Sequence, residues 1–159
     1  MPESEQEQRL AELDARIVDL LNERFALCAE EAGNGGKAAA ESGDPLADPG
    51  RLDALVKRSR DPLTPSVVRA VFREIQSGAT ALRRTVRIAY LGPPGTFTHQ
   101  AAMVHFGRSV DHVPRLGIGD VFDAVSRDEA EYGVVPVENS TEGAVTHTLD
   151  MFVESDVTI

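Results

Sequence analysis

The chain has 159 residues, enough for one ordinary domain or two small ones. Its 16 Lys and Arg residues against 26 Asp and Glu residues give a formal net charge of −10, which disfavours nucleic acid and acidic membrane surfaces as partners. Cys28 is the only cysteine, the first ten residues lack the pattern of a signal peptide, and no apolar run reaches the roughly 18 residues of a membrane span. We therefore expect a cytoplasmic protein.

The charge is distributed unevenly along the chain. Residues 1–84 carry 12 basic and 15 acidic side chains, a net charge of −3, whereas residues 85–159 carry 4 and 11, a net charge of −7. The second segment has no lysine and contains all four histidines. This contrast predicts two domains, 1–84 and 85–159.

Residues 4–32 are expected to form one long helix, because leucines and one isoleucine recur at steps of three and four. Arg24 occupies the vacant place in this apolar series. Two interpretations stay open from position alone: its aliphatic stem packs while its head reaches water, or it is a buried cation that binds an anion. The apolar series consists of Leu10, Leu13, Ile17, Leu20 and Leu27.

Two further helices are expected in the first domain. The glycine-rich segment 33–37 ends the long helix, and a short helix begins at Pro49 with Asp48 as its N-cap. A third helix begins at Pro65, capped by Thr64. Three helices of this length bury little core by themselves, so we expect a homodimer formed through the long helix.

Segments of these helices resemble the all-helical chorismate mutase family. They are LDARIVDLLNERFALCAEEAG (13–33), DPGR (48–51) and VFREIQSGATAL (71–82). That family forms an intertwined dimer and converts chorismate to prephenate without a cofactor, using cations to stabilise charge on the ether oxygen. The resemblance implies that Arg24 binds a substrate carboxylate, and that Asp48 and Arg51 occupy site positions.

Other positions depart from the family pattern. Lys37 matches the lysine that contacts the ether oxygen only with a shift of two residues. Glu7, Leu52 and Ala79 stand where the family has polar site residues, and Arg83 stands where it has a glutamine or glutamate. The helical domain is therefore either a mutase that uses Lys37 and Arg83, or a degenerate domain retained for dimerisation or regulation.

Strands and helices alternate in the second domain, which predicts a parallel sheet with crossover helices. Ligands of such sheets bind beyond the carboxyl ends of the strands. We expect strands over 86–92, 111–116, 132–138 and 156–159, and helices over 98–106, 119–131 and 143–155.

Two polar clusters follow strands of this sheet, GPPGTFT (92–98) and ENSTEG (138–143). Each hydroxyl has a simpler explanation as a helix cap: Thr96 or Thr98 for one helix, Ser140 and Thr141 for another. Glu138 ends its strand and is a candidate proton donor. The two clusters together favour a binding site, whereas His99 and His147 are expected on helix surfaces. No spacing typical of metal ligands occurs.

The stretches RIAYLGPPGTFTHQAA (87–102) and YGVVPVENSTEGAVTHTLDMF (132–152) closely resemble the prephenate dehydratase family. Its members convert prephenate to phenylpyruvate, water and carbon dioxide on the route to phenylalanine. The resemblance implies a catalytic set and a substrate-binding set. The catalytic set is Glu138, Asn139 and Ser140, and the binding set is Thr96, Thr98 and Thr141.

The expected fold is α+β and multidomain. An all-α, three-helix mutase-like unit precedes part of a parallel-sheet domain like that of periplasmic binding proteins. The family's Thr-Arg-Phe motif does not occur in these residues, so we expect the front piece of a bifunctional mutase–dehydratase. The alternative is a non-catalytic dimerisation or ligand-binding fragment. A stand-alone periplasmic-type binding domain is disfavoured because no export signal is seen.

Overall fold

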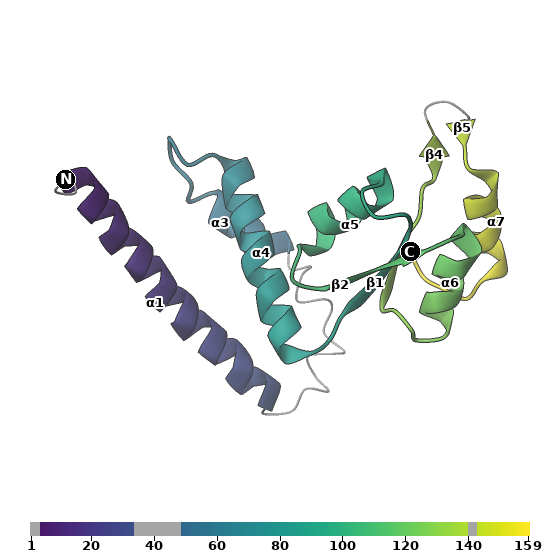
Figure 1. Ribbon diagram of the computed structural model, residues 1–159, viewed down its shortest axis with the longest axis horizontal. Helices are drawn as coiled ribbons and strands as arrows, with labels where there is room; N and C mark the ends of the chain where they lie inside the picture. Colours follow the sequence, from purple (N-terminus) through teal and green to yellow (C-terminus); the bar gives the residue numbers. More distant parts are fainter. Residues whose placement is uncertain (1–3, 34–48, 140–142) are drawn as a thin grey trace. The chain divides into compact units, whose positions relative to one another are not determined.

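The computed structural model describes residues 4–33, 49–139 and 143–159. The chain divides into two compact units, Met1–Asp44 and Pro45–Ile159. Helices and strands are labelled in Figure 1. Among the described residues, the first unit contributes one long helix and the second contributes every other helix and strand. The predicted order, helices followed by a parallel sheet with crossover helices, is confirmed.

The first unit is helix α1, Glu5–Gly33. A capping box starts it, because Glu7 N donates to Ser4 Oγ over 3.2 Å and Ser4 N donates to Glu7 Oε2 over 2.7 Å. The hydrogen bond from Ser4 N to the carboxylate, and after it the interaction with the Ser4 hydroxyl, hold the pKa of Glu7 below its usual value. The five residues of the predicted apolar series are each between 44% and 63% exposed. Helix α1 thus presents an apolar stripe at its surface.

Helices α3 (Pro49–Val56) and α4 (Pro65–Arg83) begin the second unit. Thr64 caps α4 as predicted, with Val67 N donating to its Oγ1 over 3.5 Å. The two helices contact each other, and an exposed ion pair joins Arg69 to Asp53. One face of α4 is buried, at Val68, Gln76, Ser77, Ala79 and Thr80.

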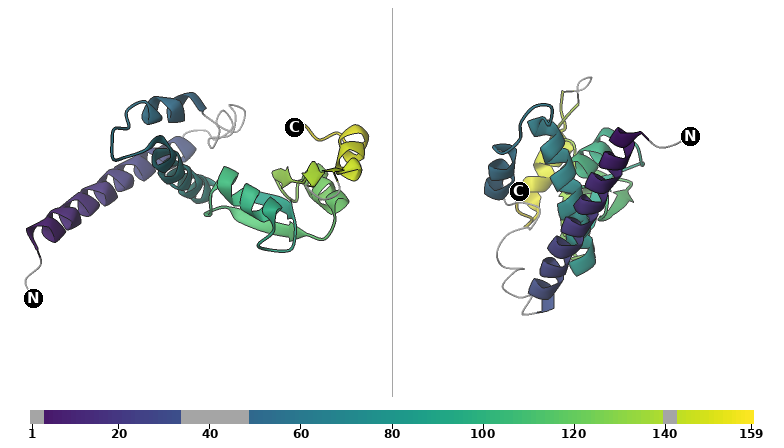
Figure 2. Two further views of the ribbon diagram at one scale, coloured as in Figure 1. Left: turned by 90° about the horizontal axis from the view of Figure 1, so that it is seen from above. Right: turned by 90° about the vertical axis from the view of Figure 1, so that its left-hand side faces the viewer.

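A three-stranded parallel sheet follows, in the order β2-β1-β3. Its strands are β1 (Arg87–Leu91), β2 (Asp111–Arg115) and β3 (Tyr132–Val134). Helices α5 (Phe97–Phe106) and α6 (Ile118–Ser126) connect the strands, and α7 (Thr146–Glu154) follows a short hairpin. Helix α5 contacts all three strands, and the left view of Figure 2 shows it lying along the sheet.

Successive residues of β1 enter different core clusters, because side chains alternate along a strand. Ile88 packs with Ala102 and Phe106 of α5, whereas Ala89 packs with Val121 and Ala124 of α6. The two helices therefore cover opposite faces of the sheet. In this three-layer arrangement, Thr96 lies in the loop that follows the carboxyl end of β1, and Thr98 lies in the first turn of α5.

Helix α6 ends earlier than predicted. It stops at Ser126, whereas the sequence pattern extended it to residue 131. The chain turns at Asp128, which has φ of 56°, and Glu129 N and Ala130 N both donate to Ala124 O. The turn buries Ala130 in the α6 core cluster. Local propensity favours one more helical turn here, but the chain turns away instead, and this turn buries Ala130.

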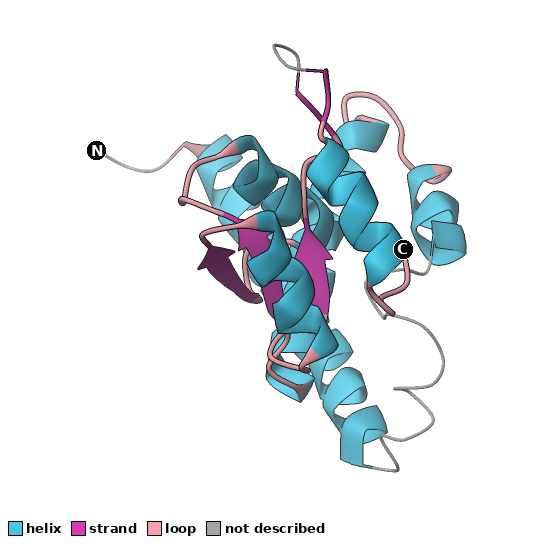
Figure 3. Cartoon of the chain, turned by 90° about the vertical axis from the view of Figure 1, so that its right-hand side faces the viewer, coloured by secondary structure: helices cyan, strands magenta, loops and turns pink. Residues whose placement is uncertain are grey.

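The predicted strand 132–138 is also wrong in extent. Strand β3 ends at Val134, and Pro136, which has no N–H for a sheet, follows. Glu138 and Asn139 form β4, which pairs antiparallel with β5, Gly143–Ala144. Figure 3 shows this hairpin standing apart from the parallel strands. Glu138 therefore does not end a strand of the parallel sheet.

Two more expectations fail at the end of the chain. Helix α7 begins at Thr146 with Val145 at its N-cap, not near residue 143, so the N-cap position does not fall on Ser140 or Thr141. Those two residues lie outside the described part of the chain. Residues 156–159 form no strand. A strand exists only where its backbone groups pair with a neighbour, and these residues pair with none of the described strands.

The segment 107–109 packs against α4. Ser77 of α4 is fully buried, and its Oγ accepts from Ser109 N over 3.1 Å. Glu74 Oε2 accepts from Arg108 N over 3.1 Å. Gly107 lies so close that a Cβ built on it would be 2.4 Å from Ser77 Cβ. This contact joins the last helix of the mutase-like segment to the first crossover of the sheet.

Candidate functional site

The loop between β1 and α5 holds two of the predicted site residues. Thr96 is the N-cap of α5, with His99 N donating to its Oγ1 over 3.4 Å. The hydroxyls of Thr96 and Thr98 lie 3.0 Å apart, and both reach Leu91 O, over 3.2 Å and 2.5 Å respectively. Of the two alternatives for the cap, the structure therefore selects Thr96.

This geometry determines what the two hydroxyls offer to a ligand. Both hydroxyls donate to Leu91 O, and either of them can donate in the contact between the two hydroxyl oxygens. Each hydroxyl has one proton and two lone pairs. His99 N already donates to one lone pair of Thr96 Oγ1, so the remaining lone pairs of the two oxygens are left for a ligand. Hydrogen-bond donors come from the N–H groups of Phe97 and Thr98, which start α5 and have no acceptor within the helix.

The second polar cluster leaves the sheet at the same edge. Tyr90 pairs with Val134 in register, so β1 and β3 end side by side and the loops after them start together. Glu138 is exposed in the hairpin. Asn139 pairs with Gly143. Ser140 and Thr141 lie outside the described residues, so convergence of the two clusters on one ligand stays a prediction.

Arg115 is a cation at this edge that the sequence pattern did not point to. It pairs with Leu91 in register, and its carbonyl accepts from Gly92 N over 2.9 Å. Its Nη2 donates to Glu129 Oε2 over 2.8 Å, so the positive charge is already paired. Its Nε is buried and has no hydrogen-bond partner within the described ranges. An anionic ligand of this loop would therefore depend mainly on backbone N–H groups.

The predicted mutase residues are distributed over the two units. Arg24, in α1, is half-buried, and its Nη1 has no hydrogen-bond partner among the residues that the structure describes. Arg51 lies on α3 and Arg83 is half-buried in the last turn of α4. Lys37 and Asp48 lie outside the described residues. Convergence of these five residues on one site stays a prediction.

Two of the departures from the mutase pattern acquire structural roles. Glu7 closes the capping box of α1, and Ala79 is 7% exposed on the buried face of α4. Neither position offers a free polar group to a substrate. The capping box could have been found from the sequence, because Ser4 and Glu7 have the spacing that such boxes require.

His99 was predicted to be a surface residue, and the structure corrects this. Its ring is half-buried and stacks on Tyr90 with 4.5 Å between ring centroids and 11° between planes. Its Nδ1 accepts from Gly95 N over 3.0 Å. His147, in contrast, is exposed on α7. The one sequence feature that could have indicated the contact of His99 with the loop is its position, four residues after Gly95 and near the start of a helix.

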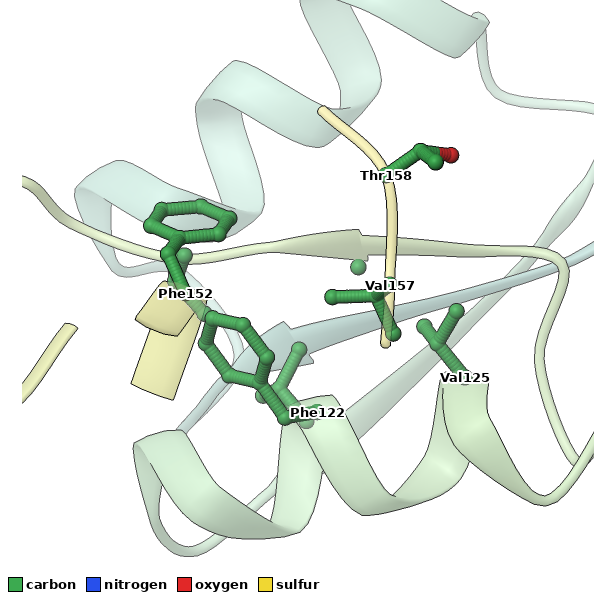
Figure 4. Close-up of a pocket in the computed structure, with 8 residues that line it drawn as sticks. Phe122, Val125, Phe152, Val157 and Thr158 are labelled. Carbon is green, nitrogen blue, oxygen red and sulfur yellow. The ribbon is translucent and has the colours of Figure 1, made fainter. Parts of the chain in front are cut away.

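A small apolar pocket of about 60 Å³ lies between α6, α7 and the end of the chain (Figure 4). Phe122 and Phe152 meet edge to face in its wall, with centroids 5.0 Å apart. Pockets that bind metabolites usually measure about 300–1,000 Å³. This pocket is therefore too small for a substrate of the size of prephenate.

A wider hollow of about 1040 Å³ lies beside the same elements. Four carboxylates border it, so it disfavours a dianion such as prephenate. The residues that line this hollow do not include Thr96, Thr98 or Glu138. The bordering acids are Asp123, Glu131, Glu154 and Asp156.

No group of three or more potential metal ligands is found among the described residues. No helix of the described part of the chain is long and apolar enough to cross a membrane.

Two family models match the chain in succession. Chorismate mutase type II matches residues 6–84, and prephenate dehydratase matches residues 88–159. The bifunctional chorismate mutase/prephenate dehydratase of Stutzerimonas stutzeri is 43% identical over 157 residues, which are 95% of this chain and 43% of that protein. The bifunctional enzyme of Aquifex aeolicus is 54% identical over 89 residues, 56% of this chain and 25% of that protein.

A solved structure, that of prephenate dehydratase from Streptococcus mutans, aligns with 44% of this chain and 37% of its own, at 41% identity and a TM-score of 0.42. The chain spans less than half the length of the bifunctional relatives it matches. Over 95% of its residues the chain is similar to bifunctional chorismate mutase/prephenate dehydratases, with the region that matches chorismate mutase preceding the region that matches prephenate dehydratase.

Proposed function

We propose that the protein acts in phenylalanine biosynthesis. Its helical region rearranges chorismate to prephenate, and its α/β region contributes to the conversion of prephenate to phenylpyruvate, water and carbon dioxide. The observation that carries this proposal is the succession of the two family matches on one chain. We place the boundary between the two regions at residues 84 and 85, between those matches.

For the mutase reaction, Arg24 is proposed to bind a carboxylate of chorismate. Arg24 is half-buried, and its buried Nη1 has no hydrogen-bond partner within the described residues, which supports this role. Rearrangement of a dianionic substrate without covalent catalysis is promoted by fixed cations more than by acids or bases. The other proposed contacts are Lys37, Asp48, Arg51 and Arg83.

Disappearance of chorismate in the presence of the purified chain tests the mutase proposal. Arg24→Ala is expected to lower kcat/KM by at least about 100-fold, the usual cost of removing a preorganised donor. Arg16→Ala is the matched control, because Arg16 is exposed on the same helix. Equal activity of the two variants would rule out the role of Arg24.

For the dehydratase reaction, the leaving hydroxyl of prephenate takes up a proton as the bond to the ring carboxylate breaks, which releases water and carbon dioxide and leaves an aromatic ring. We propose Glu138 as the proton donor, assisted by Asn139 and Ser140. Thr96, Thr98 and Thr141 are proposed to bind substrate. The common edge from which both loops leave the sheet supports this assignment.

Formation of phenylpyruvate from prephenate tests this second activity. Glu138→Gln is expected to lower kcat by about 100-fold or more, as general acids usually contribute that much. Glu154→Gln, which changes another exposed carboxylate, is the control and should retain activity. A Glu138→Gln chain with unchanged kcat would exclude the proton-donor role.

A second candidate function is a non-catalytic scaffold for dimerisation or ligand binding. The observation that favours it is the loss of polar mutase positions to structural roles, at Glu7 and Ala79. Absence of chorismate turnover by a folded chain would support it. Turnover that Arg24→Ala abolishes would reject it.

We also propose a homodimer formed through α1. The exposed apolar stripe of this helix supports it, because such a surface is stabilised by burial against a second copy. Light scattering of the eluting protein should give twice the chain mass, and Leu13→Glu with Leu20→Glu should give the monomer mass. A wild-type monomer would contradict the proposal. We further propose a cytoplasmic location, consistent with the single cysteine.

A further inference from the structure

His99 forms an unusual hydrogen bond with the loop before α5. Its Nδ1 lies 3.0 Å from Gly95 N, and the backbone N–H donates. A ring nitrogen accepts only when it carries no proton. The neutral ring of His99 therefore has its proton on Nε2, and a doubly protonated ring would lose this hydrogen bond.

Neighbouring rings set the orientation of His99. One face stacks on Tyr90, which is 1% exposed, and His112 meets His99 edge to face with centroids 5.8 Å apart. His112 is itself oriented, because its Nε2 donates to Gly107 O over 2.8 Å. Strands β1 and β2 thus provide a rigid support that aims Nδ1 of His99 at the loop.

The position of Gly95 in turn determines the geometry of the candidate site. Gly95 has φ of 89° and directly precedes Thr96, the N-cap of α5. Thr96 and Thr98 anchor the far side of the same turn to Leu91 O. The loop is therefore held at two points, one on β1 through the threonines and one through the His99 ring.

We propose that His99, as the Nε2–H tautomer, is a positioning residue that holds the loop 92–98 in the conformation that receives prephenate. This inference rests on the proposed function for the identity of the ligand. His99 acts through Gly95, which directly precedes Thr96 at the start of α5, and so it fixes the turn that carries both threonines. Loss of the bond at Gly95 releases one of the two anchors.

Nuclear magnetic resonance of the ¹⁵N-labelled chain tests the hydrogen bond directly. A ¹⁵N–¹⁵N coupling between the Gly95 amide and His99 Nδ1 is expected, because the nuclei are joined through the shared proton. The coupling should vanish in His99→Phe, which keeps an aromatic ring against Tyr90 but has no acceptor. His99→Asn, which keeps an acceptor near the position of Nδ1, should leave the Gly95 amide shift close to that of the wild type.

Titration of prephenate into the same proteins tests the positioning role. His99→Phe should weaken prephenate binding about tenfold, as expected for one lost hydrogen bond, and His99→Asn should stay within about threefold of wild type. His147→Phe, on an exposed site, is the control.

Absence of the ¹⁵N–¹⁵N coupling in the wild type would overturn the inference. So would a His99→Phe chain that has lost the coupling and binds prephenate as tightly as the wild type. If the coupling is present and the wild type binds no prephenate, the hold of His99 on the loop stands and the proposed ligand is wrong. The two failures are thereby distinguished.

Discussion

Replacement of Gly107 by alanine should destabilise the α/β part of the chain far more than an ordinary glycine substitution. Gly107 has φ of 79° and ψ of −174°, a conformation that residues with a Cβ almost never adopt, at a cost of about 1–3 kcal/mol. The new Cβ would lie 2.4 Å from Ser77 Cβ and 2.6 Å from Ser77 Oγ. Overpacking of this kind costs about 1–3 kcal/mol more. The expected loss is thus about 2–6 kcal/mol.

Gly95→Ala is a matched control for the backbone contribution. Gly95 also has a positive φ, of 89°, but nothing lies within 4 Å of a Cβ built there. Its cost should be limited to about 1–2 kcal/mol, the usual penalty for a left-handed residue. The difference between the two variants then measures the steric contact with Ser77.

Urea unfolding followed by tyrosine fluorescence gives the free energy of unfolding. The chain has no tryptophan and two tyrosines, Tyr90 and Tyr132, which lie in β1 and β3, so the signal reports on the sheet. In a Ser77→Gly background, Gly107→Ala should cost about 1–3 kcal/mol less, because the clash is relieved. Equal losses for Gly107→Ala and Gly95→Ala would refute the close contact between α4 and Gly107.

Two further effects follow from buried polar groups. Thr148 is fully buried, and its hydroxyl donates to Pro136 O over 2.7 Å. Thr148→Val should therefore lower the free energy of unfolding in urea by about 1–3 kcal/mol, whereas Thr146→Val, at an exposed position, should change it little. Equal losses in the two variants would contradict the role of the Thr148 hydroxyl. Burial raises the pKa of Tyr90 above its usual value of 10.0. Absorbance titration should therefore show one of the two tyrosines ionising at a higher pH than the other. The free energy of unfolding should fall as pH rises from the ordinary tyrosine pKa to that of Tyr90, because the unfolded chain loses this proton first. Tyr90→Phe should remove both effects, and their persistence in that variant would assign them elsewhere.

The helices were the features most accessible from sequence. The long helix ending near the glycines at 33–37, and the helix that starts at Pro65 behind Thr64, depend on caps and spacing within a few residues. These signals are local, so no partner is needed to interpret them. The order of elements in the α/β region was accessible for a similar reason, since alternating apolar segments predict a parallel sheet.

The failures occurred where a distant residue decides the outcome. Residues 127–131 favour a helix by composition, but burial of Ala130 against α6 turns the chain instead. Residues 132–138 have a strand-like pattern, and only pairing shows that β3 ends at Val134. The strand expected at 156–159 has no neighbour to pair with in the described sheet.

The candidate site likewise contains residues that the sequence pointed to and one contact that only the folded structure shows. Thr96, Thr98 and Glu138 were proposed from residue type, position and family resemblance, because ligands of such sheets bind beyond the carboxyl ends of the strands, and their roles stay predictions. The environment of His99 was missed, since it depends on Tyr90 from one strand and His112 from another. Ring stacking across strands leaves no pattern in a single stretch of sequence.

The sequence by itself indicated the family resemblance, the two-part order and the helix boundaries that depend on local caps. The tertiary structure decided which polar groups are already bonded, such as the threonine hydroxyls on Leu91 O, and which backbone conformations are required, such as that of Gly107. The physical reason is range: capping and periodicity act over a few residues, whereas hydrogen-bond partners and steric contacts join segments that only the folded chain brings together.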